Sequence, residues 1–300
     1  MTDSTSTAEL VYSDRFVELH RGDARKLPLE DESVDLVITS PPYNCRARYD
    51  GFDDWLPWGE YWDGLITPAM AECYRVLKPG GRLCVNFANV VRQNVPEGQT
   101  SPPDWEFKGH WRWTPPGSNG DWPALVDKYV WDMLNGVGFL ERERINWVKG
   151  DSAEDVTTTS TAWGSWLSAD NPSLRATSEP IYIADKLSHK RSGGTTVITK
   201  DEFMAWTRNT WFVPVRNLVT GKGANPCQFP LEIPRRLMRL YGYAEDVVLD
   251  PFCGEGTTLR AAKNEQRRAI GVEQGLKQAR RAANRCRQDL LFDDLFGVAA

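Results

Sequence analysis

The stretch from residue 246 to residue 273 constrains the fold more than any other part of the chain. Residues 246–250 form a short apolar strand, which leads into a loop over 251–258 and then into a helical pattern over 259–266. A second apolar strand, residues 269–272, follows the helix. A strand, a glycine-containing loop, a helix and a second strand make a βαβ unit, which indicates an α/β domain with a parallel sheet.

The loop of this unit indicates a nucleoside ligand. Gly254 and Gly256 allow the backbone to approach a ligand closely, and Glu273, at the end of the second strand, can accept hydrogen bonds from two ribose hydroxyl groups. The third glycine of a dinucleotide fingerprint is missing, because its place falls near Leu259. A nucleoside without phosphate groups therefore fits the loop better than a pyrophosphate.

A second informative segment, Ser40, Pro41, Pro42 and Tyr43, follows an apolar run over residues 34–38. Proline has no N–H and a fixed φ angle, so this loop holds its carbonyl groups rigidly and is rich in hydrogen-bond acceptors. Ser40 Oγ and the Pro41 carbonyl can bind the two protons of an exocyclic amine on a nucleobase and direct its lone pair at an electrophile. Tyr43 would then stack on a base that has left the duplex. The alternative interpretation is a rigid turn that ends a strand.

Together, the Thr-Ser-Pro-Pro-Tyr segment (39–43) and the Asp-Pro-Phe-Cys-Gly-Glu-Gly-Thr-Thr segment (250–258) resemble the DNA amino-methyltransferases that use S-adenosyl-L-methionine. The resemblance covers most of residues 16–286. Because the catalytic motif precedes the cofactor motif, the chain is similar to the circularly permuted class called beta. This implies an α/β fold, a permuted Rossmann-like methyltransferase sheet flanked by helices, with a small target-recognition region.

The resemblance also implies roles for individual residues. Phe252 would lie against the adenine, Asp250 and the glycine loop would face the methionine part, and Glu273 would hold the ribose. Asp23, at the end of a strand over 16–20, would accept from the adenine amino group, although a turn or helix-cap role is the alternative. Segment 225–230 is similar to the family's segment before the cofactor strand, where His is more usual than Asn225. The expected catalytic residues are Ser40, Pro41, Pro42 and Tyr43, and the expected cofactor-binding residues are Asp23, Phe229, Asp250, Pro251, Phe252, Gly254, Gly256, Thr257 and Glu273.

Three stretches divide the chain by expected role. Residues 1–150 are the catalytic half of the methyltransferase domain, 151–216 the target-recognition region with connecting strands, and 217–300 the cofactor-binding half. The strands that end at Asp23 and Ser40 open the chain and those that end at Asp250 and Glu273 close it, so one parallel sheet would carry ligands at the carboxyl ends of its strands.

Further elements are expected between these strands. They are a helix over 57–77 that Pro68 kinks or breaks, a helix stop over 78–81, a strand over 82–87, an antiparallel strand over 139–148 at the far side of the sheet, and a strand over 180–184.

Charge and cysteine content limit the partners. The net charge of −5 means that any DNA surface is local, and its candidates are Arg46, Arg48, Lys186, Lys190 and Arg191, which could equally be ordinary solvated charges. The six cysteines show no metal-binding spacing, so reduced, buried thiols and no metal site are expected. No signal peptide or membrane-spanning run is evident, which predicts a cytoplasmic protein without a membrane partner.

The substrate expected from the resemblance is the N4 amine of a flipped cytosine in double-stranded DNA, because Ser-Pro-Pro-Tyr accompanies that reaction more often than adenine N6 methylation. Adenine N6 is the second candidate, and a catalytically inactive nucleic-acid-binding module is a third. Residues 226–228, Pro-Cys-Gln, match the nucleophile motif of cytosine C5 methyltransferases, but their position before the cofactor loop opposes that chemistry. A restriction-modification role with a cognate restriction endonuclease is one expectation, and a solitary or viral protective methyltransferase is the alternative.

Overall fold

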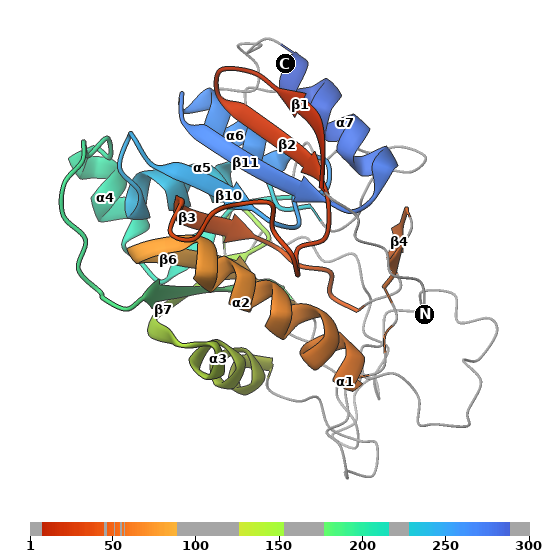
Figure 1. Cartoon of the computed structure of the whole chain (residues 1–300). Helices are drawn as coiled ribbons and strands as arrows, with labels where there is room; N and C mark the ends of the chain where they lie inside the picture. The colour runs from red at the N-terminus through yellow and green to blue at the C-terminus, as the bar shows by residue number, and fades with distance from the viewer. Residues whose placement is uncertain are drawn as a thin grey trace, which may run out of the picture.

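A computed structural model describes residues 8–44, 47–50, 52–54, 56, 58–88, 126–152, 177–215 and 228–288. Their main feature is a nine-stranded sheet in the order β1-β2-β11-β10-β3-β6-β8-β7-β9 (Figure 1). Its strands are β1 (Glu9–Ser13), β2 (Val17–Arg21), β3 (Val34–Thr39), β6 (Leu77–Asn86), β7 (Phe139–Val148), β8 (Ser178–Lys186), β9 (Thr210–Phe212), β10 (Val247–Asp250) and β11 (Arg268–Glu273).

The centre of the sheet joins the two ends of the chain. Strands β2, β11, β10, β3 and β6 pair in parallel, and the late strands β10 and β11 lie between the early strands β2 and β3. All six residues of β3 are buried, as expected for a strand that is covered on both faces. The ends of β3 and β10, which carry the two sequence motifs, therefore meet at one edge of the sheet with the ends of β2 and β11.

The direction of the far strands differs from expectation. Strand β8 runs antiparallel to β6, and β7 runs antiparallel to β8. Because the reversed strand is β8, β7 runs in the same direction as the parallel strands, and β9 pairs with it in parallel. The prediction of an antiparallel strand over residues 139–148 at the far side of the sheet is correct for its pairing with β8, whereas the strand that runs against the five parallel strands is β8.

Two helical layers cover the sheet (Figure 1). On one face, α2 (Thr67–Val76) and α3 (Val126–Val137) pack on one hydrophobic cluster. On the other face, α5 (Glu232–Tyr241), α6 (Thr257–Asn264) and α7 (Leu276–Arg287) pack on a second cluster. The sheet therefore lies between two apolar cores.

The expected break near Pro68 is present. A π-helical turn, η1 (Trp62–Ile66), separates α1 (Trp58–Tyr61) from α2, and Thr67 N–H donates to the Trp62 carbonyl five residues back. Pro68 lies in the first turn of α2 and has no N–H to give the Gly64 carbonyl, which accepts from Arg25 Nη1 at 3.2 Å instead.

The expected helix stop at residues 78–81 is part of β6. Gly80 has a φ of 76°, and a Cβ on Gly81 would lie 2.8 Å from the Lys78 carbonyl and 3.0 Å from the Asp35 carbonyl. The two glycines allow the chain to leave α2 and enter the sheet directly, with an irregular register between β3 and β6.

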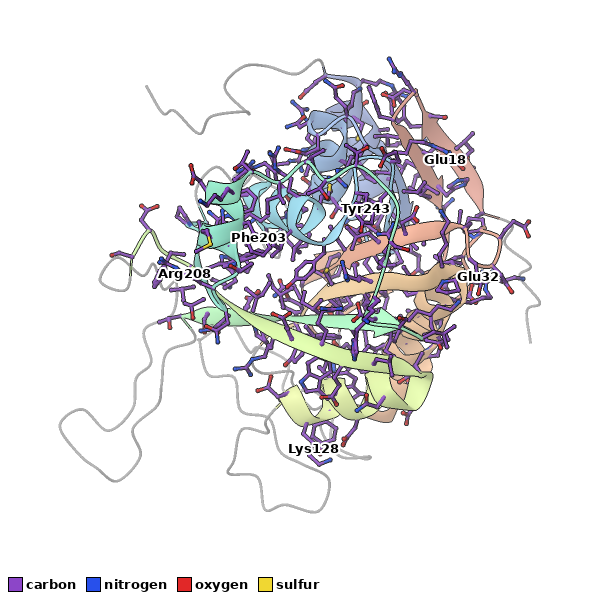
Figure 2. All side chains as sticks on the ribbon, turned by 90° about the vertical axis from the view of Figure 1, so that its left-hand side faces the viewer. Glu18, Glu32, Lys128, Phe203, Arg208 and Tyr243 are labelled. Atoms are coloured by element: carbon purple, nitrogen blue, oxygen red, sulfur yellow. The ribbon has the colours of Figure 1, made fainter. Side chains whose placement is uncertain are left out.

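The region expected to read DNA contains a short helix, α4 (Lys200–Trp206), followed by β9 at the edge of the sheet. Thr199 and Glu202 form a capping box at the start of α4. Phe203 on α4 and Arg208 after it lie at the outer edge of the molecule (Figure 2), and the Phe203 side chain is 48% exposed. Within the described ranges, no helix combines the length and the hydropathy that a membrane crossing requires.

Candidate functional site

A cavity lies at the carboxyl ends of β2, β11, β10 and β3 and collects most of the expected site residues. Eleven of the thirteen line it: Asp23, Ser40, Pro41, Pro42, Phe229, Asp250, Pro251, Phe252, Gly254, Thr257 and Glu273. Tyr43 and Gly256 do not line it. The two motifs, more than 200 residues apart in the sequence, therefore line one cavity together.

Glu273 ends β11 with both carboxylate oxygens held in place. Oε1 accepts a hydrogen bond from Gly275 N–H at 2.7 Å, and Oε2 accepts one from Gly254 N–H at 2.9 Å. Burial raises the pKa of Glu273 to about 7, although the two backbone hydrogen bonds oppose the shift. Each carboxylate oxygen keeps further acceptor capacity, which suits a ligand with two adjacent hydroxyl groups.

Asp250 ends β10 and connects the two motifs directly. Its Oδ1 accepts from Thr39 Oγ1 at 2.7 Å, and its Oδ2 accepts from Thr258 Oγ1 at 2.6 Å. Thr39 is the residue before Ser40, so the hydrogen bond fixes the strand that carries the Ser-Pro-Pro-Tyr loop to the strand that carries the glycine loop. Burial raises the pKa of Asp250 to about 6, and the hydrogen bonds from Thr258 and Thr39 oppose the shift.

The two glycines of the loop have different surroundings. Gly254 has a φ of 53° and lines the cavity. Gly256 has a φ of 81°, and a Cβ there would lie 3.0 Å from Cβ of Ala282 on α7. Gly256 therefore allows α6 to begin close against α7, whereas Gly254 is the glycine at the cavity wall.

Asp23 makes a turn after β2 and also lines the cavity. Its Oδ1 accepts from Arg25 N–H at 2.9 Å and its carbonyl from Lys26 N–H at 3.0 Å, which makes a turn after β2. Its carboxylate also lines the cavity, where Arg25 Nη2 donates to it at 2.6 Å. Burial alone would raise the pKa of Asp23, but the hydrogen bonds from Arg25 lower it on balance.

The Ser-Pro-Pro-Tyr loop is fixed by hydroxyl hydrogen bonds. Ser40 Oγ donates to Tyr43 Oη at 2.8 Å, and Tyr43 Oη lies 2.8 Å from Asn86 Oδ1 and 3.2 Å from Glu179 Oε2. Tyr61 Oη donates to the Pro42 carbonyl at 2.7 Å. The Tyr43 side chain is 8% exposed, so this loop holds it against the sheet and not at the cavity wall.

The direction of these hydrogen bonds follows from the partners of Tyr43. Asn86 Nδ2 donates to the Pro180 carbonyl at 3.0 Å, which leaves Asn86 Oδ1 to face Tyr43, and a carboxylate such as Glu179 only accepts. Tyr43 Oη therefore donates its proton towards Asn86 and Glu179 and accepts a hydrogen bond from Ser40. Ser40 Oγ has then committed its proton and presents its lone pairs as acceptors at the cavity wall.

A segment after Tyr43 completes the cavity. Tyr49, Asp50 and Phe52 line the cavity; Tyr49 ends β4 (Arg48–Tyr49) and Phe52 begins β5 (Phe52–Asp53). Asp50 Oδ2 accepts from Lys277 N–H at 3.1 Å, at the start of α7. The sequence carries no periodic signal here because the segment is held by long-range contacts and not by an amphipathic element.

Gln228 is a further cavity residue that the sequence did not single out. It lies directly before Phe229, and its Nε2 is buried with no hydrogen-bond partner among the described residues. A buried amide donor without a partner needs a hydrogen-bond acceptor. Asn225 and Cys227, and with Cys227 the hypothesis of C5 chemistry, lie outside the described residues.

Two of the basic residues considered for DNA binding are structural. Lys186 is buried and donates to the Leu77 carbonyl at 2.7 Å, and Arg191 forms ion pairs with Asp246 and Asp35. These carbonyl and carboxylate groups are buried and need cationic partners, so neither side chain is available to phosphate. Lys190 is exposed, whereas Arg46 and the Arg48 side chain lie outside the described set.

The described cysteines agree with the expectation of buried thiols. Cys73, Cys84, Cys253 and Cys286 are buried and free, and Cys45 and Cys227 are not described. In the portion of the chain with described coordinates, no group of three or more His, Cys, Asp or Glu side chains could hold a metal ion.

Comparison with known proteins identifies relatives over nearly the whole chain. The family model described as DNA methylase, for N6 and N4 methyltransferases, matches residues 34–284. The type II methyltransferase M.MjaI of Methanocaldococcus jannaschii is 28% identical over 290 residues, which cover 84% of this chain and 85% of that protein. M.MjaVI of the same organism is 33% identical over 199 residues, which cover 66% of this chain and 86% of that protein.

Solved structures agree on the fold. The putative DNA modification methylase TTHA0409 of Thermus thermophilus, complexed with S-adenosyl-L-methionine, superimposes with a TM-score of 0.63 at 26% identity, covering 89% of this chain and 92% of that one. The cytosine-N4-specific PvuII DNA methyltransferase superimposes with a TM-score of 0.65 at 20% identity, covering 96% and 92% of the two chains. The expected α/β methyltransferase fold, a large sheet flanked by helices, is confirmed, and the chain belongs to the N6/N4 DNA methylase family.

Proposed function

We propose that this protein transfers a methyl group from S-adenosyl-L-methionine to the exocyclic N4 amine of a cytosine flipped out of double-stranded DNA. The observation that carries the proposal is the shared cavity. Its lining includes Glu273 and Asp250 at the ends of two parallel strands, and also Ser40, whose hydroxyl donates to Tyr43 and keeps lone pairs as acceptors. A nucleoside cofactor and an amine can therefore meet in the same space.

The cavity residues fit S-adenosyl-L-methionine, which when bound supplies an electrophilic methyl group. Glu273 would accept from the ribose hydroxyls, Phe252 would lie beside the adenine and Asp23 would accept from its amino group. Asp250 and Gly254 would face the methionine part, and Pro251, Thr257 and Phe229 also line the cavity, whereas Gly256 lies against α7. Gln228 Nε2, buried and without a partner in the described part of the chain, suits the carboxylate of an amino acid.

The amine would be oriented by the acceptors of the catalytic loop. Hydrogen bonds from its two protons to Ser40 Oγ and the Pro41 carbonyl favour a pyramidal nitrogen whose lone pair points across the cavity. Tyr61 already donates to the Pro42 carbonyl, which leaves Pro41 as the carbonyl for the substrate. Stacking of Tyr43 on the flipped base would require its ring to become accessible, because Tyr43 is buried and does not line the cavity.

Ser40 as the first residue of the loop is the reason to prefer cytosine N4 over adenine N6, by resemblance to other members of the family. The sheet order, in which the cofactor strands β10 and β11 come last in the chain, supports assignment to the permuted beta class. The relatives named type II methyltransferases favour a cytoplasmic restriction-modification role with double-stranded DNA as partner and a cognate endonuclease as a further one.

The test is transfer of tritiated methyl groups from S-adenosyl-L-methionine to mixed-sequence duplex DNA. The wild-type protein should label DNA. Ser40→Ala should bind the cofactor normally and label DNA at least roughly 100-fold more slowly, because it lacks the Ser40 Oγ that accepts a hydrogen bond from the target amine. The control is Glu143→Gln, an exposed side chain on β7, which should retain full activity. Absence of labelling by the wild type, or Ser40→Ala at wild-type rate, contradicts the proposal.

A further inference from the structure

A chain of hydrogen bonds continues beyond the catalytic loop, away from the cavity. It runs from Ser40 Oγ to Tyr43 Oη over 2.8 Å and from Tyr43 Oη to Glu179 Oε2 over 3.2 Å. Glu179 Oε1 then pairs with Lys149 Nζ at the end of β7. Four polar side chains from three parts of the sequence are thus connected by successive hydrogen bonds, and this series is called the row below.

The two ends of this row differ in exposure. Ser40 lines the cavity, and Tyr43 is buried behind it. The side chains of Glu179 and Lys149 are 13% and 27% exposed, so the outer end of the row reaches solvent. The row therefore connects the cavity wall with the outside of the protein.

The proposed reaction creates a need for such a connection. An amine that gains a methyl group carries a positive charge until one of its N–H protons leaves. The proton faces Ser40 Oγ, which accepts it from the amine, and Ser40 has no charge with which to keep it.

We propose that Glu179 receives the proton that the target amine loses, by way of the hydroxyl groups of Ser40 and Tyr43. The inference rests on the proposed methyl transfer and adds a residue to it. The amine N–H bond breaks as an O–H bond forms at Ser40. Ser40 passes its former proton to Tyr43 Oη, and Tyr43 passes its former proton to Glu179 Oε2, so the amine loses one proton and Glu179 gains one. Glu179 then releases the proton to solvent.

The alternatives within the row are less suited to this task. Asn86 Oδ1, at 2.8 Å from Tyr43 Oη, competes with Glu179 Oε2 for the single hydroxyl proton of Tyr43, but a neutral amide does not take up a proton at neutral pH, so Asn86 only orients the tyrosine. Lys149 is cationic and keeps the neighbouring carboxylate in place through the ion pair. The charged and titratable groups that contact Glu179 among the described residues are Lys149 and Tyr43.

The experiment compares single-turnover methyl transfer by wild type and Glu179→Gln from pH 6 to pH 9. The glutamine keeps an acceptor for Tyr43 and cannot take the proton. We expect a rate roughly 10- to 100-fold lower at pH 7, with dissociation constants for cofactor and DNA within about twofold of wild type. The deficit should narrow as pH rises, because hydroxide can then remove the proton. Glu143→Gln should match the wild type.

Tyr43→Phe interrupts the same row at its centre and keeps the aromatic ring, so it tests the relay if Glu179→Gln does not fold. It should produce the same pH-dependent deficit, and the double variant should be no slower than the slower single variant. A Glu179→Gln rate within twofold of wild type at every pH overturns the relay. A deficit of equal size at every pH also overturns it, since Glu179 then only holds Tyr43 in place. Absence of methyl transfer by the wild type refutes the proposed function itself, a distinguishable outcome.

Discussion

The raised pKa of Glu273 predicts that nucleoside binding strengthens as pH rises through neutrality. Burial raises the pKa of this carboxyl to about 7. Roughly one tenth of the protein then carries an ionised Glu273 at pH 6 and roughly nine tenths at pH 8. The carboxylate can accept from both ribose hydroxyls while it keeps its bonds to Gly254 and Gly275, whereas the protonated form loses acceptor capacity. Affinity should therefore be about tenfold higher at pH 8 than at pH 6.

The assay is isothermal titration calorimetry at constant ionic strength with 5′-methylthioadenosine, a nucleoside thioether without the amino acid. This ligand lacks the amino group of S-adenosyl-L-methionine, and that amino group would otherwise titrate near pH 8 and add its own pH dependence. The control is Glu273→Gln, which should bind more weakly at pH 8 and show at most about a twofold pH dependence from Asp250, whose pKa is raised to about 6. Wild-type affinity that is constant from pH 6 to pH 8, or that falls as pH rises, would refute the reasoning.

Two stability predictions follow from the same site. Thr39→Val removes a hydrogen-bond donor to buried Asp250 and should lower the free energy of unfolding, measured by urea titration, by about 1–3 kcal/mol. An unchanged free energy of unfolding would show that Asp250 does not need this hydrogen bond. Gly256→Ala should lower it by about 1–3 kcal/mol, because φ is 81° and the new Cβ would meet Ala282 at 3.0 Å. The matched control is Gly136→Ala in α3, where a new Cβ has no atom within 4 Å, and it should raise the free energy of unfolding by about 0.5–1 kcal/mol. Equal effects of the two substitutions on the free energy of unfolding would contradict the account.

The parts of the site that lie at strand ends were predictable from the sequence. Ser40, Asp250 and Glu273 each follow a short apolar run, and parallel strands bring their carboxyl ends to one edge of a sheet. Two linked motifs were enough to place them together, even though Ser40 and Asp250 are 210 residues apart by number. That these strands belong to one parallel sheet followed from the same argument.

Residues that act through long-range side-chain contacts were not predictable. Asn86 and Glu179 meet Tyr43 because β8 returns antiparallel beside β6, and nothing in their local sequence specifies that pairing. Asn86 nevertheless ends a buried strand next to β3, and a polar residue at such a strand end was an available signal. Lys186 resembled a surface charge in the sequence but is buried in the structure. Its hydrogen-bond acceptor, the Leu77 carbonyl, lies 109 residues earlier in the chain, so the local sequence does not reveal this contact.

The identity of the methylated nucleoside tests the central claim most directly. Duplex DNA of mixed sequence is incubated with the protein and S-adenosyl-L-methionine, digested to nucleosides and analysed by mass spectrometry. We expect N4-methylcytosine, which would support both the amine chemistry at Ser40 and the preference for cytosine. N6-methyladenine would contradict the choice of base and leave the cavity roles in place, and 5-methylcytosine or no methylated nucleoside would contradict the proposed chemistry altogether.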